Sequence, residues 1–188
     1  MKTNKVKGLT YQNGLLASMT ALAIILHIFR FPFPLATFLK YDLSGVPLLL
    51  LAMFMPLKKV LVSVFVFSIG VFILGGDPIG ALMKGLAELS SIIGLILVYK
   101  KVNKVMVILV SAGTRTLLMT IANLLVTPLW LLYFARACDV YSICLNITLM
   151  YIPAIALFNI TLGIVIAGIA IAFEKYLSRI VVGWRKQG

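Results

Sequence analysis

The sequence predicts an all-α integral membrane protein, a single membrane domain over residues 1–188 formed by a bundle of six transmembrane helices. Of its 188 residues, 62% are hydrophobic and only 12% are charged. A soluble domain of this size has too little interior for so much apolar surface, whereas a lipid bilayer accommodates it. Short polar connections divide the apolar sequence into spans at about 14–30, 43–56, 58–75, 79–99, 105–134 and 151–173.

The basic residues predict how these spans are oriented. The formal net charge is +12, which in a soluble protein would favour a nucleic-acid partner. By the positive-inside rule, membrane proteins instead gather Lys and Arg on the cytoplasmic side. Twelve of the 17 basic residues lie at the two ends of the chain and in alternate connections: Lys2, Lys5, Lys7, Lys58, Lys59, Lys100, Lys101, Lys104, Lys175, Arg179, Arg185 and Lys186. We therefore expect a multi-pass protein of the cell membrane with both termini in the cytoplasm and no nucleic-acid partner.

The first span carries small residues four apart on one face. Ala17 and Ala21 have this spacing, with Gly14 one turn before them, and small residues allow another helix to approach closely in lipid. Packing within the bundle and docking of a partner protein explain this face equally well. His27, the only histidine, lies near the other end of the span and is interpreted as an interfacial residue rather than a ligand-binding one.

The segment from Arg30 to Pro47 is broken by proline and rich in aromatic and charged residues. Pro32 and Pro34 prevent the first helix from continuing, so we expect a shaped loop here. Aromatic faces beside polar groups are typical of pockets for planar organic ligands, although a plain connector between two spans is the alternative. The residues that suggest a pocket are Phe31, Phe33, Phe38, Lys40, Tyr41 and Asp42.

Charged and amide side chains interrupt three later spans. At a rise of about 1.5 Å per residue, Glu88 and Arg115 lie roughly 16 Å and 15 Å from the cytoplasmic ends of their spans. Because a lone charge at this depth costs a few kcal/mol, we predict an ion pair between neighbouring helices, or a polar cavity lined by both. Lys84, Asn123 and Asn159 lie in the outer halves of three spans. If they converge, they form an outward-facing pocket; singly, such residues are more often structural.

Two further features concern redox state and chemistry. Cys138 and Cys144 lie in the last outward-facing connection, where a disulfide and two free thiols are equally consistent with the sequence. The sequence contains no Cys or His cluster with metal-binding spacing, no phosphate-binding Gly-rich loop and no Ser, His and Asp set. We therefore expect no metal site, no catalytic residues and no ATPase activity in this chain.

Three stretches resemble the substrate-binding S components of energy-coupling factor (ECF) vitamin transporters, and among them the riboflavin type. They are FLKYDLSGVP at Phe38–Pro47, RTLLMTIANLLVTPLW at Arg115–Trp130 and IPAIALFNITLG at Ile152–Gly163. Ala17 and Ala21 match the small-residue motif that S components present to their transmembrane partner. The resemblance covers most of the chain, from about residue 15 to residue 168.

The resemblance implies a six-helix subunit that captures a vitamin from outside and docks on one transmembrane subunit and two ATPases. It also implies that Asn123 and Asn159 contact the isoalloxazine ring of a flavin. Two residues depart from the riboflavin-type pattern: Leu162 stands where a lysine is usual, and Gly45 stands where an acidic residue is common. The resemblance therefore suggests the hypothesis that Lys84 or Lys40 supplies the hydrogen-bond donor that the missing lysine would provide to the ring.

The sequence therefore predicts a non-enzymatic transport subunit without a cofactor, embedded in the lipid bilayer, with riboflavin or a related flavin as its transported ligand. Three alternatives stay open: another vitamin or small molecule as substrate, a membrane-embedded enzyme that uses Glu88 and Arg115, and an assembly subunit. The residues predicted to bind the substrate are Phe38, Lys40, Tyr41, Asp42, Lys84, Asn123 and Asn159.

Overall fold

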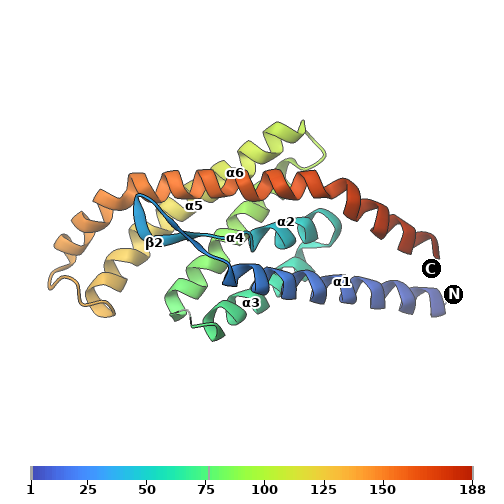
Figure 1. Ribbon diagram of the computed structural model, residues 1–188, viewed down its shortest axis with the longest axis horizontal. Coiled ribbons are helices and arrows are strands. Elements are labelled where there is room, and N and C mark those ends of the chain that lie inside the picture. Colours follow the sequence, from blue (N-terminus) through green and yellow to red (C-terminus); the bar gives the residue numbers. More distant parts are fainter. Residues whose placement is uncertain (1, 76, 188) are drawn as a thin grey trace.

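The computed structural model describes residues 2–75 and 77–187, with the side-chain surroundings described for residues 10–75 and 77–179. Within these residues, six helices and one two-stranded sheet follow one another along the chain (Figure 1). The elements are α1 (Lys2–Ile28), β1 (Phe31–Phe33), β2 (Ala36–Tyr41), α2 (Gly45–Phe54), α3 (Leu57–Ile73), α4 (Pro78–Val98), α5 (Lys104–Tyr133) and α6 (Tyr141–Gln187).

The length and apolar composition of the helices indicate a membrane protein. Among the described helices, α1, α4, α5 and α6 are long and apolar enough to cross a bilayer. The helices α2 and α3 have 10 and 17 residues, which is fewer than the roughly 20 residues that a straight span requires. Six complete spans thus stay a prediction, because two of the six helices are short.

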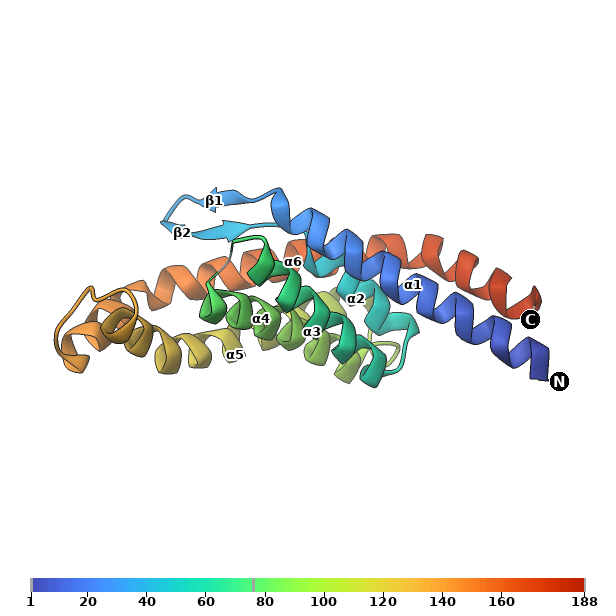
Figure 2. The ribbon, with the colours of Figure 1, turned by 90° about the horizontal axis from the view of Figure 1, so that it is seen from below.

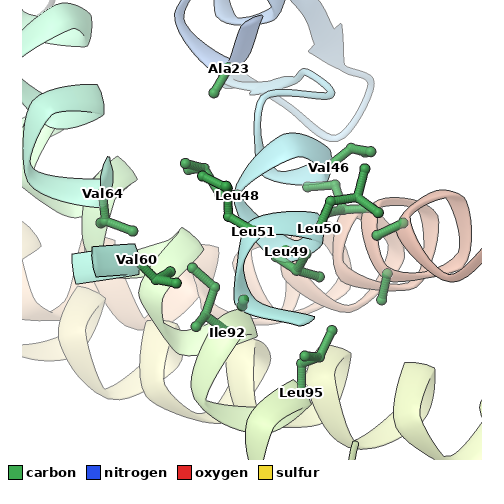
Figure 3. Close-up of a cluster of buried hydrophobic side chains, with 14 of the residues drawn as sticks. Ala23, Val46, Leu48, Leu49, Leu50, Leu51, Val60, Val64, Ile92 and Leu95 are labelled. Atoms are coloured by element: carbon green, nitrogen blue, oxygen red, sulfur yellow. The ribbon is translucent and has the colours of Figure 1, made fainter. Parts of the chain in front are cut away.

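Helix α2 lies at the centre of the bundle. Its sequence is apolar on all sides, which is typical of a helix enclosed by others, and nine of its ten residues are buried. Figure 3 shows leucines of α2 surrounded by side chains from three other helices. The labelled neighbours are Ala23 of α1, Val60 and Val64 of α3, and Ile92 and Leu95 of α4.

The two ends of the molecule carry different features. The chain termini lie together with the α2–α3 and α4–α5 connections at one end, here called the terminal end (Figures 1 and 2). The hairpin and the α3–α4 and α5–α6 connections lie toward the opposite end, called the hairpin end. The basic connections with Lys58, Lys59, Lys100 and Lys101 therefore share the terminal end, as the orientation prediction requires. Which end faces the cytoplasm stays a prediction.

The first and last helices extend beyond the spans expected from hydropathy. The expected span 14–30 lies within α1, Lys2–Ile28, except for its last two residues, and the expected span 151–173 forms part of α6, Tyr141–Gln187. Pro153 lies inside α6, although proline removes one helical hydrogen bond and usually breaks a helix. Hydropathy marks only the apolar part of each helix, so it does not show where the polar ends stop.

The prediction of an all-α chain with a loop at 30–41 is wrong for this segment, which forms an antiparallel hairpin. Phe31 lies opposite Tyr41 and Pro32 lies opposite Lys40, with an irregular register between Pro32 and Phe33. The segment ATFLKY of β2 contains the β-branched and aromatic residues that strands prefer. Proline is tolerated in β1 because that strand is an edge of the sheet.

Gly45, the first residue of α2, leaves room for a charged side chain of α4. A Cβ at this position would overlap the Glu88 carboxylate and lie 3.0 Å from Ile166 Cδ1. We therefore predict that Gly45→Ala lowers the melting temperature in detergent, because either the carboxylate or α2 has to move.

Gly168→Ala is the matched control, since a Cβ at Gly168 on α6 meets open space. Replacing a helical glycine there is expected to stabilise the protein by about 0.5–1 kcal/mol. Differential scanning fluorimetry of both variants measures the effect. Equal melting temperatures for the two variants would show that a glycine at position 45 is not needed to make room for the Glu88 carboxylate.

Candidate functional site

A chain of charged side chains crosses the centre of the bundle. His27 Nδ1 of α1 lies 3.1 Å from Asp42 Oδ2, just before α2. Lys84 Nζ of α4 lies 3.0 Å from Asp42 Oδ1 and 2.8 Å from Glu88 Oε1. Arg115 Nη1 of α5 lies 3.1 Å from Glu88 Oε2. This arrangement, here called the charge chain, connects three helices and the segment between β2 and α2.

The Glu88–Arg115 pair predicted from depth is present and fully enclosed. Glu88 is 0% exposed and Arg115 is 1% exposed. The guanidinium also donates to Ser91 Oγ at 3.2 Å and to the Ala87 carbonyl oxygen at 3.4 Å. An enclosed charge is tolerated only when its partners are complete, and Lys84, one turn before Glu88, supplies the second cation. The two carboxylates and two cations of the charge chain cancel in formal charge.

Asp42 fixes the start of α2 as well as its two charged neighbours. Its Oδ1 accepts a hydrogen bond from the backbone N–H of Ser44 at 3.0 Å and another from the Ser44 hydroxyl. Ser44 is the residue directly before α2, so the Asp42 carboxylate fixes the turn that leads into the helix. The end of the hairpin is therefore attached to α1, α2 and α4 through one side chain.

A cavity of about 640 Å³ lies between the hairpin and the parts of α4, α5 and α6 that face the hairpin end. This volume falls within the range of about 300–1,000 Å³ that small-molecule sites occupy. Aromatic and amide side chains line it together with part of the charge chain: Phe38, Trp130, Tyr151, Phe158, Asn123, Asn159, His27, Asp42, Lys84 and Arg115. The arrangement combines apolar ring surfaces with a few polar groups, as ligand sites do.

Six of the seven predicted substrate-binding residues line this cavity: Phe38, Lys40, Asp42, Lys84, Asn123 and Asn159. Tyr41 does not line it, so its role in substrate binding stays a prediction without support from the cavity. Side chains alternate along a strand, so Tyr41 points away from the face that carries Lys40. The Tyr41 hydroxyl lies 2.6 Å from Thr161 Oγ1 of α6, beside a smaller groove of about 340 Å³.

The interpretation of His27 as an interfacial residue is wrong, and several cavity residues were not predicted. His27 is 5% exposed, so it is a buried partner of Asp42 and not an interfacial residue. Thr127, Trp130 and Tyr151 line the cavity without having been predicted. A signal exists for two of them, because Thr127 lies one helical turn after Asn123 and Tyr151 lies about two turns before Asn159.

The small-residue face of α1 points away from the bundle. Ala17 and Ala21 are exposed, a Cβ at Gly14 would meet open space, and Ala23 on the other side of α1 is fully buried. The face is therefore free of packing contacts within the described residues. Of the two explanations for it, packing within the bundle does not apply.

The two cysteines form a disulfide at the hairpin end. Cys138 in the α5–α6 connection is joined to Cys144 in the first turns of α6, with 5.7 Å between their Cα atoms. Ile147 and Thr148, within one turn of Cys144, line the cavity. The disulfide thus holds the start of α6 where it borders the cavity.

At the terminal end, Tyr99 connects the α4–α5 connection to α6. Its hydroxyl donates to Glu174 Oε1 at 2.7 Å, and Lys104 Nζ lies 3.5 Å from Glu174 Oε2. Burial raises the pKa of Tyr99 above its usual value, and the hydrogen bond to the Glu174 carboxylate raises it further. Tyr99 therefore stays a neutral donor at physiological pH.

Comparisons with known proteins identify the fold. No protein-family model and no curated protein matches the sequence. A solved structure described as the S component of a bacterial ECF transporter matches with a TM-score of 0.75 and 22% identity, over 92% of this chain and 98% of that chain. The S-component fold implied by the resemblance is thereby confirmed. The riboflavin type stays a prediction.

Removing one partner of the enclosed ion pair is predicted to be more harmful than removing both. Arg115→Met leaves the Glu88 carboxylate with Lys84 as its only cation, and we expect a loss of about 3–5 kcal/mol in stability. In the double variant Glu88→Gln with Arg115→Met, much of this loss is expected to be recovered, because no uncompensated charge remains. Thermal unfolding in detergent, followed by tryptophan fluorescence, measures both effects.

The control for this comparison is Arg136→Met, at an exposed arginine of the α5–α6 connection. It is expected to melt within about 0.5 kcal/mol of the unmodified protein. If Arg115→Met behaves like this control, or if the double variant is no more stable than the single one, the pair does not hold the bundle together.

Proposed function

We propose that this chain is the substrate-binding subunit of an ECF-type importer that captures riboflavin or a related flavin from outside the cell. The observation that carries the proposal is the cavity of about 640 Å³ at the hairpin end, within an S-component fold. The hairpin end faces outward in this proposal, and both termini are cytoplasmic.

The cavity wall suits a planar aromatic ligand. Phe38 of β2 contacts Tyr151 of α6 edge to face, with 5.3 Å between the ring centroids, and Trp130 and Phe158 add further ring surface. Aromatic rings pack well against the faces of other rings. Amide and charged groups line the same cavity, where they are available to bind the polar edge of such a ligand.

Both departures from the riboflavin-type pattern have a counterpart in the structure that is compatible with this proposal. Leu162 is 1% exposed and borders the smaller groove instead of the cavity. Lys84 lines the cavity from α4, which supports the hypothesis that it supplies the missing ammonium group. The space beside Gly45 holds the Glu88 carboxylate, so an acidic group is present there although it comes from another helix.

The exposed small-residue face of α1 supports the proposed assembly. We assign it to the transmembrane subunit of the importer, because helices associate closely in lipid through such faces. ATP hydrolysis belongs to two partner ATPases in this proposal, and the chain itself is not an enzyme. Glu88 and Arg115 are bound to each other and enclosed, which does not favour a catalytic role for this pair.

Riboflavin binding is the direct test. We predict saturable quenching of riboflavin fluorescence by the protein in detergent at submicromolar ligand. Asn159→Leu removes an amide from the cavity and is expected to weaken binding about tenfold or more.

Asn146→Leu makes the same change at an exposed position of α6 and is expected to bind like the unmodified protein. Absence of saturable quenching would exclude riboflavin. Equal affinities for the two variants would place the site elsewhere.

Docking is predicted to depend on Ala17 and Ala21. Ala17→Leu and Ala21→Leu are expected to abolish co-purification of the transmembrane and ATPase subunits while riboflavin binding persists, because the larger side chains prevent close helix contact. Ala172→Leu, at an exposed alanine of α6, is the control. Full complex formation by both α1 variants would contradict the assignment of this face.

A further inference from the structure

The amide of Asn159 has its orientation fixed by two contacts. Its Nδ2 donates to the Ile155 carbonyl oxygen at 2.9 Å, and its Oδ1 accepts from Arg115 Nε at 3.3 Å. A backbone carbonyl only accepts hydrogen bonds and a guanidinium only donates them. Both contacts therefore require the same orientation, and a flipped amide would lose both at once.

Asn123 on α5 is held in the same manner by different partners. Its Nδ2 donates to the Met119 carbonyl oxygen at 2.8 Å, and its Oδ1 accepts from the Thr127 hydroxyl at 3.0 Å. Each partner lies one helical turn away from Asn123, on either side of it. The Met119 carbonyl fixes which end of the amide carries the nitrogen, and the Thr127 hydroxyl fixes the other end.

These contacts leave the same groups free on both amides. A primary amide has two N–H donors and an oxygen with two lone pairs, and each asparagine uses one donor and one lone pair. Within the described residues, neither amide has a further hydrogen-bond partner, and both line the cavity. Each thus has one donor and one acceptor available for a bound molecule.

We propose that Arg115 and Thr127 are positioning residues for ligand recognition, which fix the Asn159 and Asn123 amides so that each presents a donor beside an acceptor. The proposal rests on the proposed function of the cavity as the substrate site. Arg115 is itself held by Glu88, so the charge chain sets the orientation of one recognition group. The matching edge of the ligand carries a hydrogen-bond acceptor next to a donor.

The preset orientation matters because a free amide rotates and samples both arrangements. Ordering a side chain during binding costs affinity, and a site whose groups are already oriented avoids that cost. Loss of the Thr127 hydroxyl is expected to release the Asn123 oxygen while its nitrogen stays on the Met119 carbonyl. Thr127 also lines the cavity, so weaker binding alone does not show the positioning role, and a comparison with and without the Asn123 amide is needed.

The test is a double-mutant cycle with riboflavin as the probe. Thr127→Val is expected to weaken binding about fivefold, as for the loss of one hydrogen bond, and Thr127→Ser restores it. In an Asn123→Ala background, Thr127→Val is expected to have no further effect, because the amide that it positions is absent. The matched control is Thr116→Val on the same helix, whose hydroxyl donates to the Ala112 carbonyl oxygen one turn earlier.

Two results of the cycle would overturn the proposal. One is a Thr127→Val affinity equal to that of Thr116→Val, and the other is an equal loss with and without the Asn123 side chain. Arg115→Lys with Asn159→Ala forms a parallel cycle, since lysine keeps a cation near Glu88 but removes Nε.

A measurement without ligand separates this proposal from the proposed function. In ¹⁵N NMR spectra of the detergent-solubilised protein, Thr127→Val is expected to shift the side-chain amide resonances of Asn123 and speed their hydrogen exchange, whereas Thr116→Val leaves them unchanged. Unchanged Asn123 resonances in Thr127→Val would overturn the positioning role. If riboflavin fails to bind the unmodified protein, the flavin assignment falls, and the spectra still decide the positioning role.

Discussion

The enclosed ion pair between Glu88 and Arg115 is the interaction on which most of this structure depends. It connects α4 to α5 near the middle of both helices, and Lys84 extends it to Asp42 at the start of α2. His27 adds α1, and the Arg115 hydrogen bond to Asn159 adds α6. Because incomplete pairing of enclosed charges costs several kcal/mol, moving any one of these elements away from the others is expected to be costly.

The same interaction places the candidate site. His27, Asp42, Lys84 and Arg115 of the charge chain line the cavity. These polar groups of its inner surface also hold the helices in place. The apolar helix α2 fills the space on the other side, and Gly45 leaves room for the Glu88 carboxylate between α2 and α4. Under the proposed function, stability and ligand recognition share residues, and a substitution in the charge chain is expected to affect both.

The predictable part of the fold follows from the bilayer as solvent. Apolar composition indicates a helical bundle, and helical rise places Glu88 and Arg115 at one depth, where lone charges are too costly. The pairing of His27 with Asp42, 15 residues later in the chain, has no such local signal, because it depends on the packing of α1 against the segment before α2. The hairpin was missed because the two prolines indicate an interruption of the helix without indicating what replaces it.

The site shows a similar division. The polar residues Lys84, Asn123 and Asn159 are conspicuous in apolar spans, so their convergence was predictable. Tyr41 was not, since its direction depends on the alternation of side chains along a strand that hydropathy does not reveal. The roles of Thr127 and Arg115 in orienting two amides depend on distances between side chains, which a pattern of residue types does not contain.

The proposed function predicts that the cavity lined by the charge chain holds a small aromatic molecule. Native mass spectrometry of the protein, purified in mild detergent from cells supplied with riboflavin, tests it, because the added mass identifies whichever molecule is bound. We expect one bound molecule with the mass of a flavin, and we expect it to be absent when Asn123 and Asn159 are both replaced by leucine. If no molecule is bound, or if the double variant retains it equally, the cavity is not the site of a bound aromatic molecule.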